Sequence, residues 1–259
     1  MARTVNEQAH AVKRNEILDV AQRLVMTKGY EQMAIQDILG DLQISKGAFY
    51  HYFGSKQALL AALIERFCQE AEEILFPIVQ DPHSPTLQKL QRFFDAAARW
   101  KTDRKTYILS LLRVWYADDN VIMRQKVQAR MVKHFTPLLA SVIRQGVQEG
   151  VLTAPFPDHM SEVVLSILQS LGDAFAELLL SDQPEGDDLQ RAECIAAAYT
   201  HALERVLGAP AGSLSLIDAE TLKEWFAAQS DNIAGRGGLE GAQSLPSLPP
   251  APSYSLTGL

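Results

Sequence analysis

The chain has 259 residues, of which 47% are hydrophobic and 21% are charged, enough to bury the core of one large domain or two modest ones. Its net charge of −7 at pH 7 argues against a general affinity for nucleic acids, so such a function would need a local patch. The two cysteines, Cys68 and Cys194, are too few for a disulfide framework or a cysteine-rich zinc site, and we expect reduced thiols in a cytoplasmic protein.

Two further features bear on location. The N-terminal stretch MARTVNEQAHAVKRN has no apolar segment, so we expect no signal peptide. The most apolar stretch, residues 163–180, is interrupted by Gln169, Asp173 and Glu177. These polar residues argue against a membrane span, and we expect no membrane partner.

Apolar residues recur at helical spacing almost throughout, and strand patterns are nearly absent, which predicts an all-α fold. Gly29 fits the position just after a helix, and Ser55 fits the N-cap of another. Prolines at positions 77, 82 and 85 predict a loop. The predicted helices cover residues 10–28, 34–42, 45–52, 55–74, 86–102, 104–116, 121–149, 159–180, 188–207 and 219–228.

The charge is divided unevenly along the chain. Residues 1–66 carry eight Lys or Arg and seven Asp or Glu, a net charge of +1, and the remainder carries −8. The acidity therefore belongs to the C-terminal part. The N-terminal helices are close to neutral and can still present a basic surface.

Two short predicted helices flank Leu42-Gln43-Ile44, a spacing that suits a helix-turn-helix. Phe49 and Phe53 would anchor the second helix inward. Its outer side would then face the major groove of DNA, where small residues allow close approach and polar side chains reach bases or phosphates. The predicted DNA-binding residues are Gln36, Ser45, Lys46, Gly47, Ala48, Tyr50, His51 and Lys56.

Residues 29–60, GYEQMAIQDILGDLQISKGAFYHYFGSKQALL, resemble the DNA-binding domain of TetR/AcrR-type transcriptional regulators. The resemblance covers about the first 65 residues and implies a homodimeric repressor that a small-molecule effector releases from a palindromic double-stranded DNA operator. One departure is that Met33 and Ala34 stand where the family usually has Thr or Ser. Those hydroxyls cap the first short helix and contact phosphate, so we expect a cap weaker by about 1 kcal/mol.

The resemblance also implies that the C-terminal helices bind the effector and form the dimer. We expect a small apolar or aromatic ligand, because pockets for small molecules are mostly apolar. The candidate ligand-binding residues are Phe93, Trp100, Tyr107, Leu111, Trp115, Tyr116, Met131, Phe135 and Phe175. The candidate dimer-interface residues are Val164, Leu168, Leu171, Phe175, Ile195, Tyr199, Leu203 and Val206. Plain core packing is the alternative for both sets.

These inferences give three segments. Residues 1–54 form the helix-turn-helix domain, with the start of a connecting helix reaching about residue 66. Residues 55–229 form the ligand-binding and dimerisation domain. Gly, Pro and Ser make up 14 of the last 30 residues, so residues 230–259 are predicted to be a disordered tail.

Other functions have less support. The sequence contains no HExxH, GxSxG, P-loop or dinucleotide-binding motif, and the histidines lack metal-ligand spacing, so we predict no enzyme, no metal and no cofactor. The absent hydroxyls at Met33 and Ala34 leave one alternative open. It is a helical ligand-binding or interaction protein with a weakened DNA-reading head.

Overall fold

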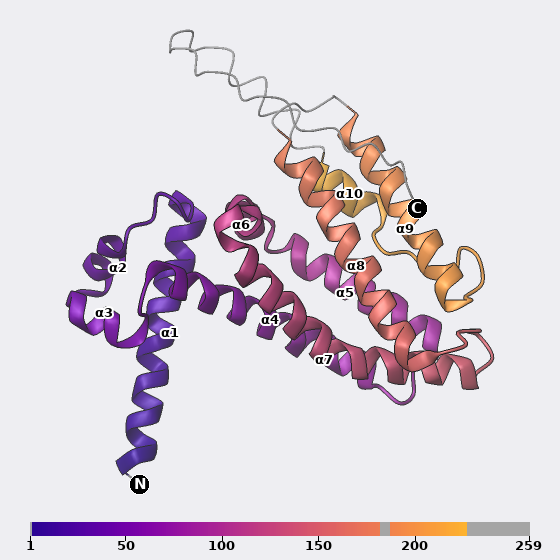
Figure 1. Cartoon of the computed structure of the whole chain (residues 1–259), viewed down its shortest axis with the longest axis horizontal. Helices are drawn as coiled ribbons and strands as arrows, with labels where there is room; N and C mark the ends of the chain where they lie inside the picture. Colours follow the sequence, from indigo (N-terminus) through magenta and orange to yellow (C-terminus); the bar gives the residue numbers. More distant parts are fainter. Residues whose placement is uncertain (1, 182–186, 227–259) are drawn as a thin grey trace, which may run out of the picture.

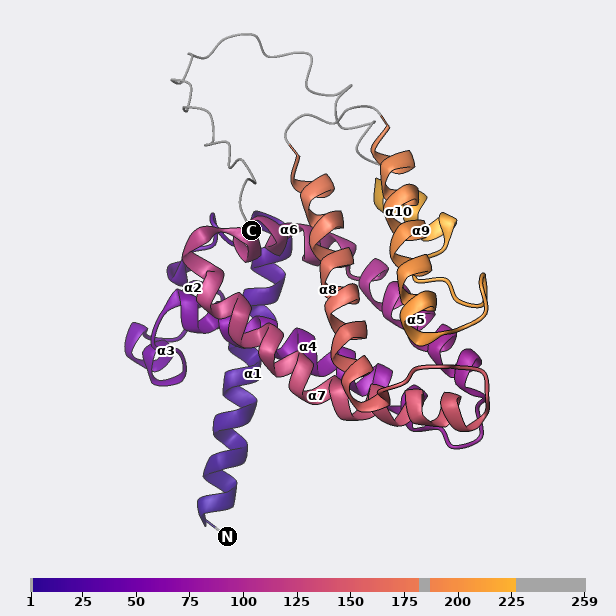
Figure 2. The same ribbon diagram turned by 45° about the vertical axis from the view of Figure 1, so that its right-hand side comes forward.

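The computed structural model describes residues 2–181 and 187–226, and every regular element in these ranges is a helix (Figure 1, Figure 2). The elements are α1 (Ala2–Lys28), α2 (Ile35–Leu42), α3 (Lys46–Tyr52), α4 (Lys56–Gln80), α5 (Thr86–Thr102), α6 (Lys105–Tyr116), a short 3₁₀ helix η1 (Asp118–Asn120), α7 (Val121–Gln148), α8 (Pro157–Leu180), α9 (Asp188–Leu207) and α10 (Ala219–Phe226). The prediction of an all-α fold is confirmed.

Helices α1–α3 and the first turns of α4 form the part that we call the head. Local hydrogen bonds set its helix ends. Gly29 follows α1 with a φ of +80°, as expected for the residue after a helix. The Ser45 hydroxyl accepts from the Ala48 N–H at 3.1 Å, and the Ser55 hydroxyl accepts from the Ala58 N–H at 3.0 Å. These two caps fix where α3 and α4 begin.

The turn between α2 and α3 uses an unusual residue. Gln43 ends α2 with a φ of +51°, in the left-handed region that Gly or Asn normally occupies. The Ile44 N–H donates to the Leu39 carbonyl at 3.1 Å, which closes the end of the helix. The tight connection predicted between the two short helices is therefore present.

The hydrophobic core of the head also includes residues of α6. Its buried residues include Ile17, Leu18, Ile38, Phe49, Phe53 and Leu63. Tyr107 and Val114 of α6 belong to the same buried cluster, and α6 packs against α1. Helix α6 therefore helps to complete the core of the head, and the domain boundary at residues 54–55 stays a prediction.

Helix α4 runs further than predicted. Pro77 lies inside it and α4 ends only at Gln80, so the expectation that Pro77 marks a loop was wrong. A proline inside a helix removes one backbone hydrogen bond and costs about 3 kcal/mol. Leu75 and Val79, on either side of Pro77, are buried in the second core, and this burial offsets the cost.

Helices α5–α10 and the C-terminal part of α4 form the part that we call the body. Helix α7 packs along α8, and α8 runs beside α9 along one side of the body (Figure 1, Figure 2). Helix α10 packs against α9 and α5. The second core, between α4, α5, α7, α8 and α9, includes Leu90, Phe94, Leu139, Ile143 and Leu203.

Helix α8 is the one helix among the described residues that is long and apolar enough, by length and composition, to cross a membrane. Its most apolar window of 18 residues is 22% buried. The core helix of a soluble protein passes the same test, so this observation is weak evidence of a membrane span. The predicted tail, residues 230–259, lies outside the described residues.

Candidate nucleic-acid interface

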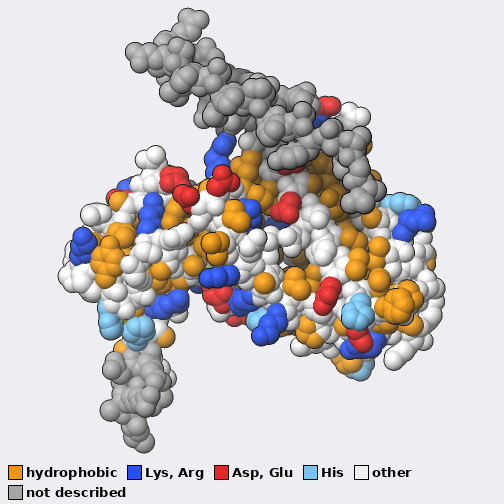
Figure 3. Space-filling view, viewed as in Figure 1, with side chains coloured by type: hydrophobic (Ala, Val, Ile, Leu, Met, Phe, Trp, Pro, Cys, Tyr) orange, Lys and Arg blue, Asp and Glu red, His pale blue; other side chains and the backbone are white. Residues whose placement is uncertain are grey.

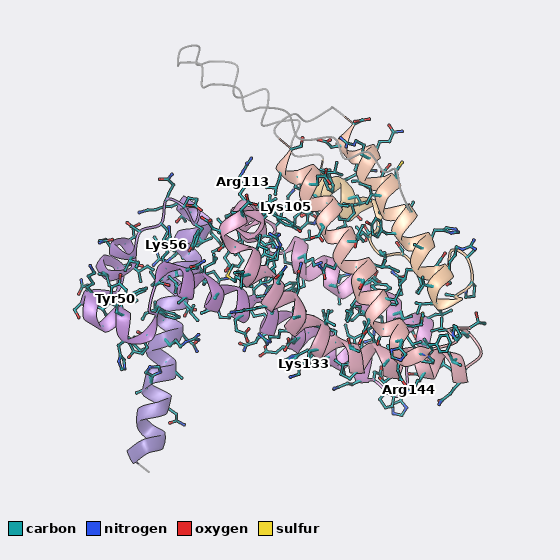
Figure 4. All side chains as sticks on the ribbon, viewed as in Figure 1. Tyr50, Lys56, Lys105, Arg113, Lys133 and Arg144 are labelled. Atoms are coloured by element: carbon teal, nitrogen blue, oxygen red, sulfur yellow. The ribbon has the colours of Figure 1, made fainter. Side chains whose placement is uncertain are left out.

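Helix α3 has one buried side and one open side. Phe49 and Phe53 are 0% and 3% exposed and hold the helix on the core of the head. The side chains of Lys46, Tyr50 and His51 are exposed on the other side. Figure 4 shows Tyr50 at the outer end of the head, away from the body. The structure therefore separates the anchoring and exposed residues as the sequence pattern predicted.

Gly47 leaves space on this open side. A Cβ atom added there would meet only the Ser45 hydroxyl, at 3.9 Å, so the protein itself does not require a glycine. Ala48 next to it is partly buried. Small residues at the start of α3 let an external surface approach the helix backbone.

A hollow of about 380 Å³ lies between the start of α2, the open side of α3 and the start of α4. Its lining includes the predicted DNA-binding residues Gln36, Lys46, Tyr50 and Lys56 together with one carboxylate, Glu31. The structure thus brings together four residues that the sequence places over 21 positions. Ser45, Gly47, Ala48 and His51 lie outside this lining, on α3 or its N-cap.

The ammonium groups of the two lysines in this hollow are available to bind an anion. Neither Lys46 nor Lys56 forms an ion pair with a described carboxylate. The Lys46 Nζ lies 5.9 Å from the ring centroid of Tyr50, and the Lys56 Nζ donates to the Glu31 backbone carbonyl at 3.2 Å. Unpaired ammonium groups beside an open surface are suited to binding phosphate. Figure 3 shows blue Lys and Arg side chains along the outer surface of the head.

The unusual pair before α2 has a clear structural role. Met33 is 1% exposed and fills the core of the head. Ala34 occupies the N-cap with extended backbone and cannot accept a hydrogen bond through its side chain. The Asp37 carboxylate instead accepts from the Ala34 N–H at 2.9 Å and pairs with Lys28. These contacts, the Ala34 hydrogen bond first, lower the pKa of Asp37 below its ordinary value.

Two residues beside the interface were not found by sequence reasoning. The His10 ring on α1 lies 4.6 Å from the Tyr52 ring and 5.5 Å from the His51 ring, measured between centroids. Tyr30 lies beneath the Lys56 ammonium, 4.4 Å from ring centroid to Nζ. Both contacts join residues at least 26 positions apart, so helical periodicity could not reveal them.

Most candidate ligand-binding residues are packed in the two cores. Phe93, Trp100 and Phe135 are buried in the second core, and Tyr107 is buried in the core of the head. Leu111, Trp115, Met131 and Phe175 are partly buried against these cores. Tyr116 alone among the nine lines a described hollow.

That hollow measures about 520 Å³ and is lined by Tyr116, Asp173, Glu177, Leu180 and Ser181. The Tyr116 hydroxyl donates to Asp173 at 2.6 Å, and burial followed by this hydrogen bond raises the pKa of Tyr116. Neither carboxylate forms an ion pair with a described cation. Within the described residues no group of three His, Cys, Asp or Glu could hold a metal ion.

The candidate dimer residues divide into two groups. Val164, Leu171 and Leu203 are at most 5% exposed within one chain, so they belong to its own core. The partly exposed group along α8 and α9 comprises Leu168, Phe175, Ile195, Tyr199 and Val206. This second group is available to a second chain.

Two family models match the chain. The model of bacterial regulatory proteins of the tetR family matches residues 17–63, within α1 to α4, the span that contains the candidate interface. The model of the tetracyclin repressor-like C-terminal domain matches residues 114–175. The chain belongs to the TetR family. The predicted resemblance is confirmed, and TetR-family proteins are transcriptional regulators rather than enzymes, as the motifs indicated.

Several curated relatives of this TetR-family protein are transcriptional regulators. The repressor DhaR of Mycobacterium sp. (strain GP1) is 26% identical over 83 residues, 32% of this chain and 42% of DhaR. The repressor NemR of Escherichia coli (strain K12) is 29% identical over 76 residues, 29% of this chain and 38% of NemR. The chain thus spans less than half the length of these two curated relatives.

Solved structures of TetR-family regulators share the fold. A regulator from Pectobacterium atrosepticum aligns with a TM-score of 0.58 and 20% identity, covering 78% of this chain and 98% of that one. The reduced form of E. coli NemR aligns with a TM-score of 0.52 and 18% identity, covering 76% of this chain and 99% of that one. At this identity the likeness shows the fold alone.

Proposed function

We propose that this TetR-family protein is a homodimeric repressor that binds a near-palindromic DNA operator through α3 and the start of α4. The observation that carries the proposal is the arrangement around the 380 Å³ hollow, where Lys46 and Lys56 are free of ion pairs beside the exposed Tyr50. Phosphate contacts from these residues would fix the register of α3, and the small residues Gly47 and Ala48 would let it approach the bases.

Selection of bound duplexes from random DNA tests this proposal. The full-length protein is expected to enrich one near-palindromic sequence, with half-sites about one helical turn apart. The double variant Tyr50→Ala, Lys56→Ala is expected to lose this binding. Lys133→Ala is the matched control, because it removes an exposed lysine on α7, away from the head (Figure 4).

The result also decides the alternative function. A protein that enriches no sequence would not be a repressor of this kind. Weak DNA binding without sequence preference, unchanged in the Tyr50→Ala, Lys56→Ala variant, would favour the helical ligand-binding or interaction protein with a weakened head.

The dimer is proposed to form through α8 and α9. Among the described residues, α8 leaves most of its apolar window unburied in one chain. A Cβ atom added at Gly172 on α8 would meet nothing within 4 Å, and Ala202 on α9 is exposed. Small exposed residues beside an apolar stripe allow a second pair of helices to pack closely. Two α8–α9 pairs would then form a four-helix interface.

For the effector we propose a small apolar or aromatic molecule that binds within the body and favours a conformer unable to place both heads on the operator. The hollow beside Tyr116 is one candidate place. Its carboxylates Asp173 and Glu177 form no ion pair with a described cation, and they would favour a ligand that also carries a hydrogen-bond donor or a positive charge. Release of the selected operator by compounds of this class, and not by matched anions, tests the proposal. Asp173→Asn should reduce that response.

A further inference from the structure

Tyr30 contacts both ends of Lys56, the first residue of α4. The Tyr30 hydroxyl donates to the Lys56 backbone carbonyl at 3.2 Å, and the Lys56 Nζ lies 4.4 Å from the centroid of the Tyr30 ring. The same Nζ donates to the Glu31 backbone carbonyl at 3.2 Å. The short segment after α1 therefore holds both the backbone and the ammonium group of Lys56.

With these contacts made, Lys56 can still bind a further partner. A lysine ammonium has three N–H donors, and the Glu31 carbonyl accepts one of them. The face of an aromatic ring attracts the cation without neutralising it. Lys56 is only partly exposed and lines the hollow between α2, α3 and α4. With a second N–H directed at the Tyr30 ring, one donor and the positive charge remain for a group that enters this hollow.

Tyr30 is suited to a lasting structural contact of this kind. It is 8% exposed, and burial raises the pKa of Tyr30 to about 12. Its hydroxyl is held in place by the hydrogen bond that it donates to the Lys56 carbonyl. A free lysine side chain samples many rotamers, and each must be given up when it binds a phosphate. A lysine that is already held in place gives up fewer.

We propose that Tyr30 is a positioning residue for DNA binding, which holds the Lys56 ammonium at the edge of the hollow so that it meets one backbone phosphate. Lys46 lines the same hollow and supplies a second positive charge, while Glu31 supplies one negative charge. The inference rests on the proposed DNA-binding function and deepens it, because it names a buried residue on which one phosphate contact depends.

A purely structural role for Tyr30 would have a different signature. Loss of a packing contact would lower the stability of the head but would not change the number of phosphates that the protein neutralises. The dependence of affinity on salt concentration reports that number, with a slope of about 0.9 per phosphate. The salt slope therefore separates positioning from packing.

The experiment measures affinity for the selected operator by fluorescence anisotropy over a range of salt concentrations. Lys56→Ala is expected to reduce the salt slope by about 2 for a dimer, or about 1 for each head. Tyr30→Leu is expected to reproduce most of this change although it removes no charge. In the Lys56→Ala background, Tyr30→Leu should cause little further loss. Tyr30→Phe keeps the ring and should keep most of the slope.

Two outcomes would overturn the inference. One is an unchanged slope in Tyr30→Leu, whether its affinity stays the same or falls equally at every salt concentration. The other is additive losses in the double variant. Should Tyr30→Leu fail to fold, pentafluorophenylalanine at position 30 keeps the shape of the ring and removes its attraction for a cation. Its slope should fall below that of Tyr30→Phe, and an equal slope would overturn the inference.

Failure of the proposed function would look different. A wild-type protein that selects no DNA sequence contradicts the repressor proposal itself. A wild-type protein that binds its operator while Tyr30→Leu matches it in affinity and slope contradicts only the role of Tyr30.

Discussion

The carboxylate of Asp37 accepts a hydrogen bond from the backbone N–H of Ala34 at 2.9 Å. This is the reciprocal half of a capping box, in which the residue three positions into a helix binds back to the N-cap. The other half is missing, because alanine has no side-chain oxygen to accept from the helix. The start of α2 is therefore capped by Asp37, a residue of α2 itself. The ion pair of Asp37 with Lys28 also connects α2 to α1.

Asp37→Ala is expected to lower the urea midpoint of unfolding at pH 7. The pKa of Asp37 is lower in the folded protein than its ordinary value of 3.8, so its stabilising effect is complete above that value. The effect is lost as the pH falls through the folded pKa. The difference between wild type and variant should therefore shrink in urea titrations near pH 3. Asp119→Ala, at an exposed carboxylate, is the control and should show no such difference.

Ala34→Thr should restore the missing half of the cap. Ala34 already has the extended backbone of an N-cap, with φ −99° and ψ 155°. The new hydroxyl should raise the free energy of unfolding by about 1 kcal/mol, as measured by urea titration. Ala34 lines the same hollow as Lys46 and Lys56, so the same hydroxyl should also tighten operator binding if a phosphate enters there. A variant that is no more stable than wild type would show that the cap was not deficient.

Substitutions at Gly47 should separate folding from DNA binding. A Cβ atom there meets only the Ser45 hydroxyl at 3.9 Å, so Gly47→Ala and Gly47→Leu should fold normally. Replacement of a glycine in a helix removes a cost of roughly 0.5–1 kcal/mol, so thermal stability should hold or rise. Operator affinity should fall with side-chain size, because the new atoms would enter the gap between α3 and DNA. Equal affinity for all three proteins would place DNA elsewhere.

Ala202→Arg should disrupt the proposed dimer without changing the fold of the single chain. Ala202 is exposed within one chain and lies beside the partly exposed Ile195, Tyr199 and Val206 on α9. Sedimentation equilibrium should show a monomer, and circular dichroism should show unchanged helix content. Ala197→Arg changes an exposed alanine on another side of α9 and should remain dimeric. If both variants or neither dissociate, α9 does not form the interface in this way.

The sequence alone determined that the chain is helical, several of the helix ends, and the orientation of α3, although α1 begins at Ala2 rather than at residue 10 as predicted. Residues 86–102 and 188–207 were predicted with the observed ends, and Ser45 and Ser55 marked the starts of α3 and α4. Helical periodicity also separated Phe49, which is buried, from Tyr50, which is 43% exposed. These features depend on hydrogen bonds and side-chain spacing within about four residues, which a sequence displays directly.

Only the tertiary structure decided which distant residues meet. It placed Tyr30 against Lys56, His10 against Tyr52, and Tyr107 of α6 in the core of the head. Tertiary packing also allows α4 to continue past Pro77 as far as Gln80. In each case packing between helices far apart in the chain outweighs or adds to the local preference. The energy of such packing depends on which surfaces are brought together, and local sequence patterns do not show which distant surfaces will meet.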